Sequence, residues 1–134
     1  MAGLVIDASV AVKWFIAEDR SAEAQRILSA DADLIAPTSI IYEVFHALWD
    51  AARTRRLPAS RLPAFAEVLP TPFARLVPME QLFAAAAAMA QAHKLPIYDC
   101  AYVALAQREH AELITADERM FAVARKVKVK ARLL

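Results

Sequence analysis

Residues 3–9 read GLVIDAS, and this short stretch decides how the chain begins to fold. The three apolar residues at 4–6 include two that are β-branched, which is typical of a buried strand. The strand ends directly on Asp7, and a carboxylate at the end of a buried segment needs a physical reason. One reason is local, because an acid before a helix is favoured by about 0.3–1 kcal/mol and Ser9 can cap that helix.

Similar short apolar segments recur along the chain and alternate with helical patterns. Strands are predicted at 4–6, 33–37, 73–77 and 112–115, with an edge strand in the alternating KVKVK of 126–130. Helices are predicted at about 9–16, 21–29, 39–55, 60–69, 79–93, 98–109 and 117–125. This alternation favours a single α/β domain over residues 1–134, with a mostly parallel sheet of four to five strands covered by helices on both faces.

The composition excludes several classes of protein. Hydrophobic residues make up 59% of the 134 residues, which argues against disorder, and the longest apolar run is nine residues. That run is short of the roughly 20 residues that span a bilayer, and we expect a cytoplasmic protein without a signal peptide. The only cysteine, Cys100, excludes an internal disulfide, and the only glycine, Gly3, excludes glycine-rich phosphate loops.

Acidic residues follow two of the predicted strands. Asp7 follows the first strand directly, and Asp117 follows the strand at 112–115 by two residues. Because ligands of parallel sheets bind beyond the carboxyl ends of the strands, both carboxylates are expected at one edge. Asp117 also has a local interpretation, since Thr115 and Glu118 match a capping box with Asp117 in the first turn.

Two further acids lie on predicted helices. Helical spacing puts Asp99 on the core-facing side with Tyr102, where a carboxylate is costly unless it is paired or binds a cation. Glu43 lies just off the apolar stripe of its helix, and the helical wheel alone favours a solvated side chain. Asp50, seven residues later, is an alternative to Glu43 on the same polar side.

Carboxylates that converge cannot all stay ionised without a counter-charge, and a hard divalent cation supplies one. Mg²⁺ prefers oxygen ligands and retains water for chemistry on phosphates. Basic residues cluster at Arg53, Arg55 and Arg56, and no acid follows Glu118. Acids at a sheet edge with basic residues nearby favour phosphodiester chemistry.

Four segments, in this order, resemble the PIN-domain ribonucleases, specifically the VapC-like toxins of bacterial toxin–antitoxin pairs. They are LVIDASVAVKWF at 4–15, APTSIIYEVFHAL at 36–48, LPIYDCAYVALA at 95–106 and LITADERMF at 113–121. The resemblance covers essentially the whole chain. It selects Glu43 rather than Asp50 as the acid of the second segment.

The resemblance implies an α/β/α sandwich and Mg²⁺- or Mn²⁺-dependent cleavage of RNA, with 5′-phosphate and 3′-hydroxyl ends. It also implies a homodimer and a cognate antitoxin. No membrane partner is expected, because the longest apolar run is too short to span a bilayer. The site residues follow residue by residue. The resemblance assigns metal binding and catalysis to Asp7, Glu43, Asp99 and Asp117. It implies that Ser9 and Thr115 orient these acids or a water molecule. Lys13, Arg53 and Arg55 are candidate RNA contacts, although a solvated role for Lys13 is equally compatible with the sequence.

Other functions remain open at this stage. A PIN-like protein that binds RNA or regulates without turnover has the same acids. A phosphatase with a strand-end aspartate nucleophile expects D-x-D-x-T, but position 9 is serine. A receiver-like module expects an adjacent acidic pair near the first strand, where residues 6–8 are Ile-Asp-Ala.

Overall fold

The computed structural model describes residues 3–134, and at its centre lies a parallel sheet of five strands. The strands are β1 (Gly3–Ile6), β2 (Asp33–Pro37), β3 (Phe73–Val77), β4 (Glu112–Thr115) and β5 (Ala131–Leu133). They are ordered β3-β2-β1-β4-β5, and every neighbouring pair is parallel. The prediction of a parallel sheet with four to five strands is confirmed.

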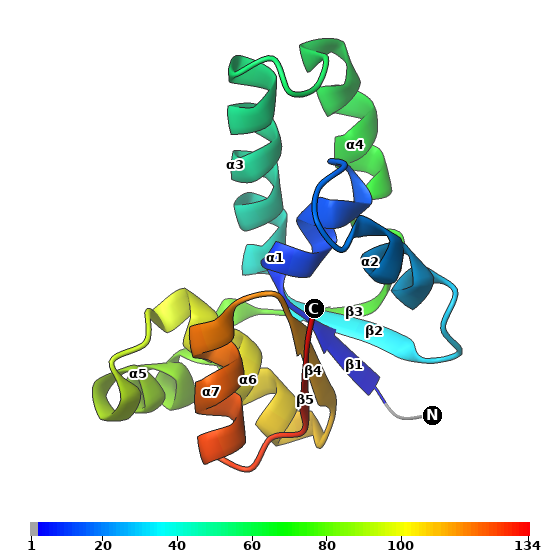
Figure 1. Cartoon of the computed structure of the whole chain (residues 1–134). Coiled ribbons are helices and arrows are strands. Elements are labelled where there is room, and N and C mark those ends of the chain that lie inside the picture. The colour runs from blue at the N-terminus through cyan, green and yellow to red at the C-terminus, as the bar shows by residue number, and fades with distance from the viewer. Residues whose placement is uncertain (1–2) are drawn as a thin grey trace.

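Helices cover both faces of this sheet (Figure 1). Within residues 3–134 they are α1 (Ala8–Ala11), α2 (Ser21–Leu28), α3 (Ser39–Arg53), α4 (Leu62–Val68), α5 (Phe83–His93), α6 (Ile97–Glu109) and α7 (Glu118–Lys126). The helices α1 and α2 lie on one side, where α3 and α4 extend away from the sheet, and α5, α6 and α7 lie on the other side (Figure 1). The α/β/α sandwich implied by the resemblance is therefore confirmed.

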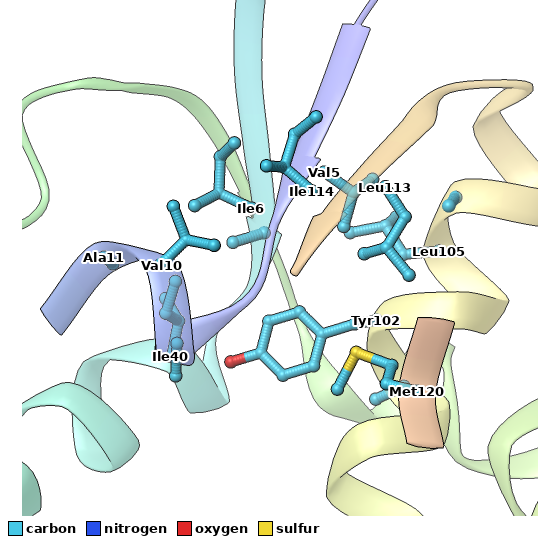
Figure 2. Close-up of a cluster of buried hydrophobic side chains, with 14 of the residues drawn as sticks. Val5, Ile6, Val10, Ala11, Ile40, Tyr102, Leu105, Leu113, Ile114 and Met120 are labelled. Atoms are coloured by element: carbon cyan, nitrogen blue, oxygen red, sulfur yellow. The ribbon is translucent and has the colours of Figure 1, made fainter. Parts of the chain in front are cut away.

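The core forms where β1 and β4 meet α6. Val5 and Ile6 of β1 are fully buried, because β1 is the central strand and has helices on both faces. Helix α6 contacts β1, β2 and β4, and residues 100–106 of α6 are all buried. Figure 2 shows the aromatic ring of Tyr102 among these apolar side chains. The core thus fixes α6 against the central strands.

The predicted edge strand over 126–130 is wrong. Helix α7 continues to Lys126, and Lys128 adopts a left-handed backbone with φ of 63°. Val129 is buried rather than aligned in a strand, and the edge strand β5 begins at Ala131. The alternating pattern was misleading because its apolar residues anchor a turn between α7 and β5.

The strand order places a topological switch beside β1. The chain proceeds from β1 outward to β2 and β3, then returns to the other side of β1 with β4. Crevices beyond the carboxyl ends of strands at such a switch are the usual ligand sites of α/β folds. Asp7 follows β1 there, and Thr115 ends β4. None of the helices formed by residues 3–134 combines the length and the hydropathy needed to span a membrane.

Candidate active site

Asp7 is held rigidly at the end of β1. Its backbone N–H donates to the Ile114 carbonyl of β4 at 3.0 Å, and its own carbonyl accepts the Val10 and Ala11 N–H groups of α1. The side chain is only 3% exposed. The carboxylate therefore lies at the switch point with little freedom to move, since both neighbouring elements bind its backbone.

Two hydroxyl groups donate to the same oxygen of Asp7. Ser9 Oγ lies 2.6 Å from Asp7 Oδ2, and Thr115 Oγ1 lies 2.8 Å from it. Ser9 Oγ accepts the Ala116 N–H, and Thr115 Oγ1 accepts the Asp117 N–H. The bonds from Thr115 to Asp7 and from Ala116 to Ser9 join segments that are more than a hundred residues apart in sequence, and the carboxylate is oriented by hydroxyls from both α1 and β4.

The expected helix caps differ in the structure. Ser9 lies inside α1 and its hydroxyl binds Asp7 rather than capping the helix. The N-cap of α7 is Asp117, whose Oδ1 accepts the Met120 N–H at 3.0 Å, so the Thr115–Glu118 capping box is wrong. Thr115 is fully buried in β4, and its hydroxyl donates to Asp7 instead of capping α7.

The helical wheel alone favours a solvated Glu43, but in the structure this residue is half-buried. Its Oε1 accepts a hydrogen bond from the Tyr102 hydroxyl of α6 at 3.0 Å. The Ser39 hydroxyl lies buried near both residues and has no hydrogen bond of regular geometry to any described residue. By contrast, Asp50 is paired with Arg53 on the outer side of α3. The structure thus turns Glu43 toward α6 and leaves Asp50 in a surface ion pair.

Asp99 lies in the first turn of α6 and is also half-buried. Arg119 of α7 lies near enough for its charge to lower the pKa of Asp99, and its guanidinium donates to the Lys94 carbonyl at 2.9 Å. The Arg119 side chain remains exposed. A cation therefore lies beside the carboxylate cluster, and within residues 3–134 Arg119 forms no ion pair.

The four carboxylates influence one another electrostatically. Burial raises the pKa of Glu43 to about 7, and the charges of Asp7 and Asp99 contribute to this rise. Burial raises the pKa of Asp99 to about 6, with contributions from Asp7 and Asp117. Burial likewise raises the pKa of Asp7, although the hydroxyls of Ser9 and Thr115 oppose it. The folded chain therefore gathers acids whose burial and mutual repulsion outweigh the nearby charge of Arg119.

The donor set fits a hard divalent cation. All four candidate ligands present carboxylate oxygens, the donors that Mg²⁺ and Mn²⁺ prefer, and the unpartnered Ser39 hydroxyl adds a polar group beside Glu43. No three His, Cys, Asp or Glu side chains in the described part of the chain form a ready-made metal cage. The four carboxylates still supply the oxygen donors and the negative charge that a divalent cation requires.

A cleft opens beside two of these acids. Tyr42, Glu43 and His46 of α3 line it together with Tyr98 and Asp99 of α6, and its volume is about 570 Å³. The aromatic side chains make its walls largely apolar. A ligand in this cleft contacts the carboxylate site and the outer face of α3 at the same time.

The candidate basic contacts are placed differently from one another. The Lys13 ammonium is buried and donates to Glu18 at 3.2 Å and to the Asp19 carbonyl at 2.7 Å. A phosphate contact from Lys13 stays a prediction, and its ammonium is already engaged within the loop after α1. Arg53 and Arg55 are exposed at the far end of α3.

Several residues at the site were missed in the sequence. Helical spacing predicts only a position on the core-facing side for Tyr102, yet its hydroxyl donates to Glu43. Its spacing of three residues from Asp99 is the signal that identifies it, because both then face the same neighbour. Tyr42 directly precedes Glu43, and Arg119 follows Asp117 by two residues. Only the tertiary structure brings Tyr42 into one cleft with Asp99 and places the Arg119 charge near Asp99.

We expect the Thr115 hydroxyl to stabilise the site measurably. The Thr115→Val variant keeps the shape but leaves the Asp117 N–H without its partner and removes one of the two donors to Asp7 Oδ2. It should therefore lower the free energy of unfolding by about 1–3 kcal/mol. Urea denaturation measures this change. Thr115→Ser is the matched control, because it retains the hydroxyl and loses only one methyl group. Equal stability of the Val variant and the wild type contradicts the expectation.

The chain is similar in sequence to known proteins. Residues 4–126 match the family model described as PIN domain. Ribonuclease VapC3 of Pyrobaculum aerophilum is 33% identical over 119 residues, which cover 87% of this chain and 91% of that protein.

Two solved structures have a similar fold. PAE2754 from Pyrobaculum aerophilum aligns over 97% of this chain and 83% of its own, with a TM-score of 0.73 and 20% identity. FitAcB from Neisseria gonorrhoeae aligns over 96% of this chain and 95% of its own, with a TM-score of 0.65 and 15% identity. At these identities the two structures support the fold alone.

Proposed function

This chain belongs to the PIN-domain family, and from that premise we propose that it is a divalent-metal-dependent endoribonuclease. The similarity to Ribonuclease VapC3 supports RNA as the substrate. The observation that carries the proposal is the convergence of Asp7, Glu43 and Asp99 with Asp117 at the switch point. Each of the first three has a pKa raised by burial and by charged neighbours.

Asp7, Glu43, Asp99 and Asp117 would hold the Mg²⁺ or Mn²⁺ ion in this proposal. A bound cation supplies charge neutralisation for the phosphate and lowers the pKa of water. Ser9 and Thr115 orient Asp7 through its Oδ2, and the Tyr102 hydroxyl orients Glu43 through Oε1. Burial and the neighbouring Glu43 raise the pKa of Tyr102, so this hydroxyl keeps its proton and remains a donor.

The proposed reaction is hydrolysis. Water adds to phosphorus, the bond to the 3′ oxygen breaks, and the products carry 5′-phosphate and 3′-hydroxyl ends. Arg119 is placed beside Asp99 with its guanidinium exposed, so it can bind a phosphate oxygen as charge develops. We further propose that the chain is the toxin of a toxin–antitoxin pair, acts as a homodimer, and is inhibited by a protein antitoxin.

Purified protein should cleave structured RNA only when Mg²⁺ or Mn²⁺ is present. The measurement is gel analysis of end-labelled RNA with each ion or with EDTA, followed by identification of the product ends. Glu43→Gln should be inactive, whereas Asp50→Asn, on the same helix but in a surface ion pair, should cleave normally. Cleavage in EDTA would overturn the metal dependence. RNA binding without cleavage in any ion would favour the non-catalytic alternative.

A further inference from the structure

The outer face of α3 carries a line of exposed aromatic side chains that starts at the carboxylate site. Tyr42 is 79% exposed and Trp49 is 51% exposed, and the exposed His46 lies between them. Spacings of four and three residues put these side chains on one side of the helix. Tyr98, 63% exposed, lies across the cleft at the start of α6. We call Tyr42, His46, Trp49 and Tyr98 the aromatic ladder.

Packing of the hydrophobic core does not explain the aromatic ladder, because its side chains are exposed. Of the four aromatic side chains with large exposure among residues 3–134, three belong to it, and only Phe83 lies elsewhere. The His46 and Trp49 rings lie 5.8 Å apart and are tilted by 32°, and both side chains are exposed. Leaving such surface in water is unfavourable, and its concentration beside one cleft indicates a ligand.

Cations lie at the far end of the ladder. The Arg53 guanidinium carbon is 5.4 Å from the centre of the Trp49 ring. Arg53 also pairs with Asp50, whereas Arg55 makes no ion pair within the described chain. Rings in a row with positive charge beside them are the combination that binds single-stranded nucleic acids, because any base can stack on a ring while the backbone contacts the cations.

We propose that the aromatic ladder is a base-stacking site for unpaired nucleotides beside the bond to be cleaved. The inference rests on the proposed ribonuclease function. The cleft that contains Glu43 and Asp99 also contains Tyr42, His46 and Tyr98, so an RNA strand at the acids continues onto the rings. Tyr42 and Trp49 are separated by about 10 Å along the helix, which corresponds to about three stacked nucleotides. Arg53 and Arg55 then face the phosphates at the outer end.

The test measures binding without cleavage. An Asp7→Asn protein in EDTA serves as the parent, and the probes are a fluorescent single-stranded oligoadenylate and the same strand in a blunt duplex. Tyr42→Leu and Trp49→Leu remove a ring but keep an apolar side chain. Each should weaken single-strand binding about 5- to 150-fold, while Tyr42→Phe and Trp49→Phe, which keep an aromatic ring at each position, should bind much more tightly than the Leu variants.

Two controls separate the loss of a stacking ring from a general loss of aromatic surface or of the fold. Phe83→Leu removes an exposed aromatic ring outside the ladder and should leave binding unchanged. Circular dichroism and melting temperature show whether each variant is folded, and the Phe variants keep the test valid if a Leu variant is not. The duplex should bind more weakly than the single strand, because its bases are already paired and stacked.

Other outcomes decide between alternatives. If the Leu variants bind the single strand as the parent does, the ladder proposal is overturned. If in addition they change the oligomeric state measured by light scattering, the face is an interface between copies of this chain. If wild type cleaves RNA but the Leu variants bind the single strand like the parent, only the stacking proposal is contradicted. If the ladder is needed for binding but no ion supports cleavage, only the proposed ribonuclease function is contradicted.

Discussion

Asp99→Asn is expected to abolish RNA cleavage and, in the absence of metal, to make the protein more stable. Losing a residue that only supports a metal ligand costs about 10- to 100-fold in activity, so losing a ligand should cost more than about 100-fold. Asn keeps the size of the side chain and removes the charge. Rate measurements at saturating Mg²⁺ and melting curves in EDTA test the two effects separately.

The stability gain follows from the electrostatics of the site. Burial and the charges of Asp7 and Asp117 raise the pKa of Asp99 to about 6, so its ionised form is unfavourable in the folded protein at pH 8. A neutral amide avoids this cost. Glu109→Gln is the matched control, because Glu109 lies on the same helix in a surface ion pair with Arg75, away from the proposed ligands. It should cleave RNA normally and melt no higher than wild type.

Opposite effects on activity and stability are the signature of a functional acid. A structural carboxylate that is paired or capped loses stability when it is neutralised. If Asp99→Asn melts at a lower temperature than wild type in EDTA at pH 8, Asp99 has a stabilising partner and the metal-site interpretation fails. If the variant cleaves RNA at the wild-type rate, Asp99 is not a ligand.

The second large effect is the response of stability to pH and to metal. The pKa of Glu43 rises from 4.5 to about 7 on folding, and that of Asp99 from 3.8 to about 6. Groups whose folded pKa is raised stabilise the protein below the unfolded value, and this contribution is lost as pH rises through the folded value. The metal-free protein should therefore lose stability from these two groups between about pH 4 and 7.

The measurement compares melting temperatures in EDTA across this pH range for wild type and for a Glu43→Gln, Asp99→Asn double variant. Because other groups titrate as well, the expected result is a difference between the two proteins. The melting temperature of the double variant should rise relative to that of wild type between pH 4 and 7, and the difference should be constant above that range. A difference that does not change with pH would show that these carboxylates do not carry raised pKa values.

Added Mg²⁺ or Mn²⁺ should restore the stability that wild type loses at higher pH, and it should have little effect on the double variant. A free ion concentration of 100 times the dissociation constant adds about 2.7 kcal/mol, which corresponds to a rise in melting temperature of about 10 °C for a chain of this size. The rise should be large at pH 8 and small at pH 5, because protons compete with the ion for the carboxylates. The double variant should respond weakly at both values. An equal response in both proteins would place the ion elsewhere.

The fold was predictable because its pattern is local. The segments 4–6, 33–37, 73–77 and 112–115 are short apolar runs bounded by helix or turn signals, and each is a strand of the sheet or lies within one. The segment 126–130 failed because two alternating valines fit a turn as well as a strand. The position of β5 depends on where α7 ends, which is decided by packing against β4 and β5.

The site was only partly predictable. Because the carboxyl ends of parallel strands share one edge, the sequence predicts Asp7 and Asp117 at that edge. The effect of the Asp117 charge on the pKa of Asp7 agrees with this prediction. The helical wheel predicts a solvated Glu43, but in the structure the Tyr102 hydroxyl of α6 donates a hydrogen bond to it. The contact joins residues 59 positions apart, and no local pattern encodes such a distance.

The sequence by itself determined the alternation of strands and helices and the kinds of side chain at the strand ends, because the hydrophobic period acts over a few residues. Only the tertiary structure decided which hydroxyls orient Asp7, that Tyr102 orients Glu43, and that Tyr42 and Trp49 lie open beside the cleft. These features depend on how α3, α6 and α7 pack around the central strands. The burial that raises the pKa of the acids arises from the same packing, so the chemistry of the site belongs to the assembled fold.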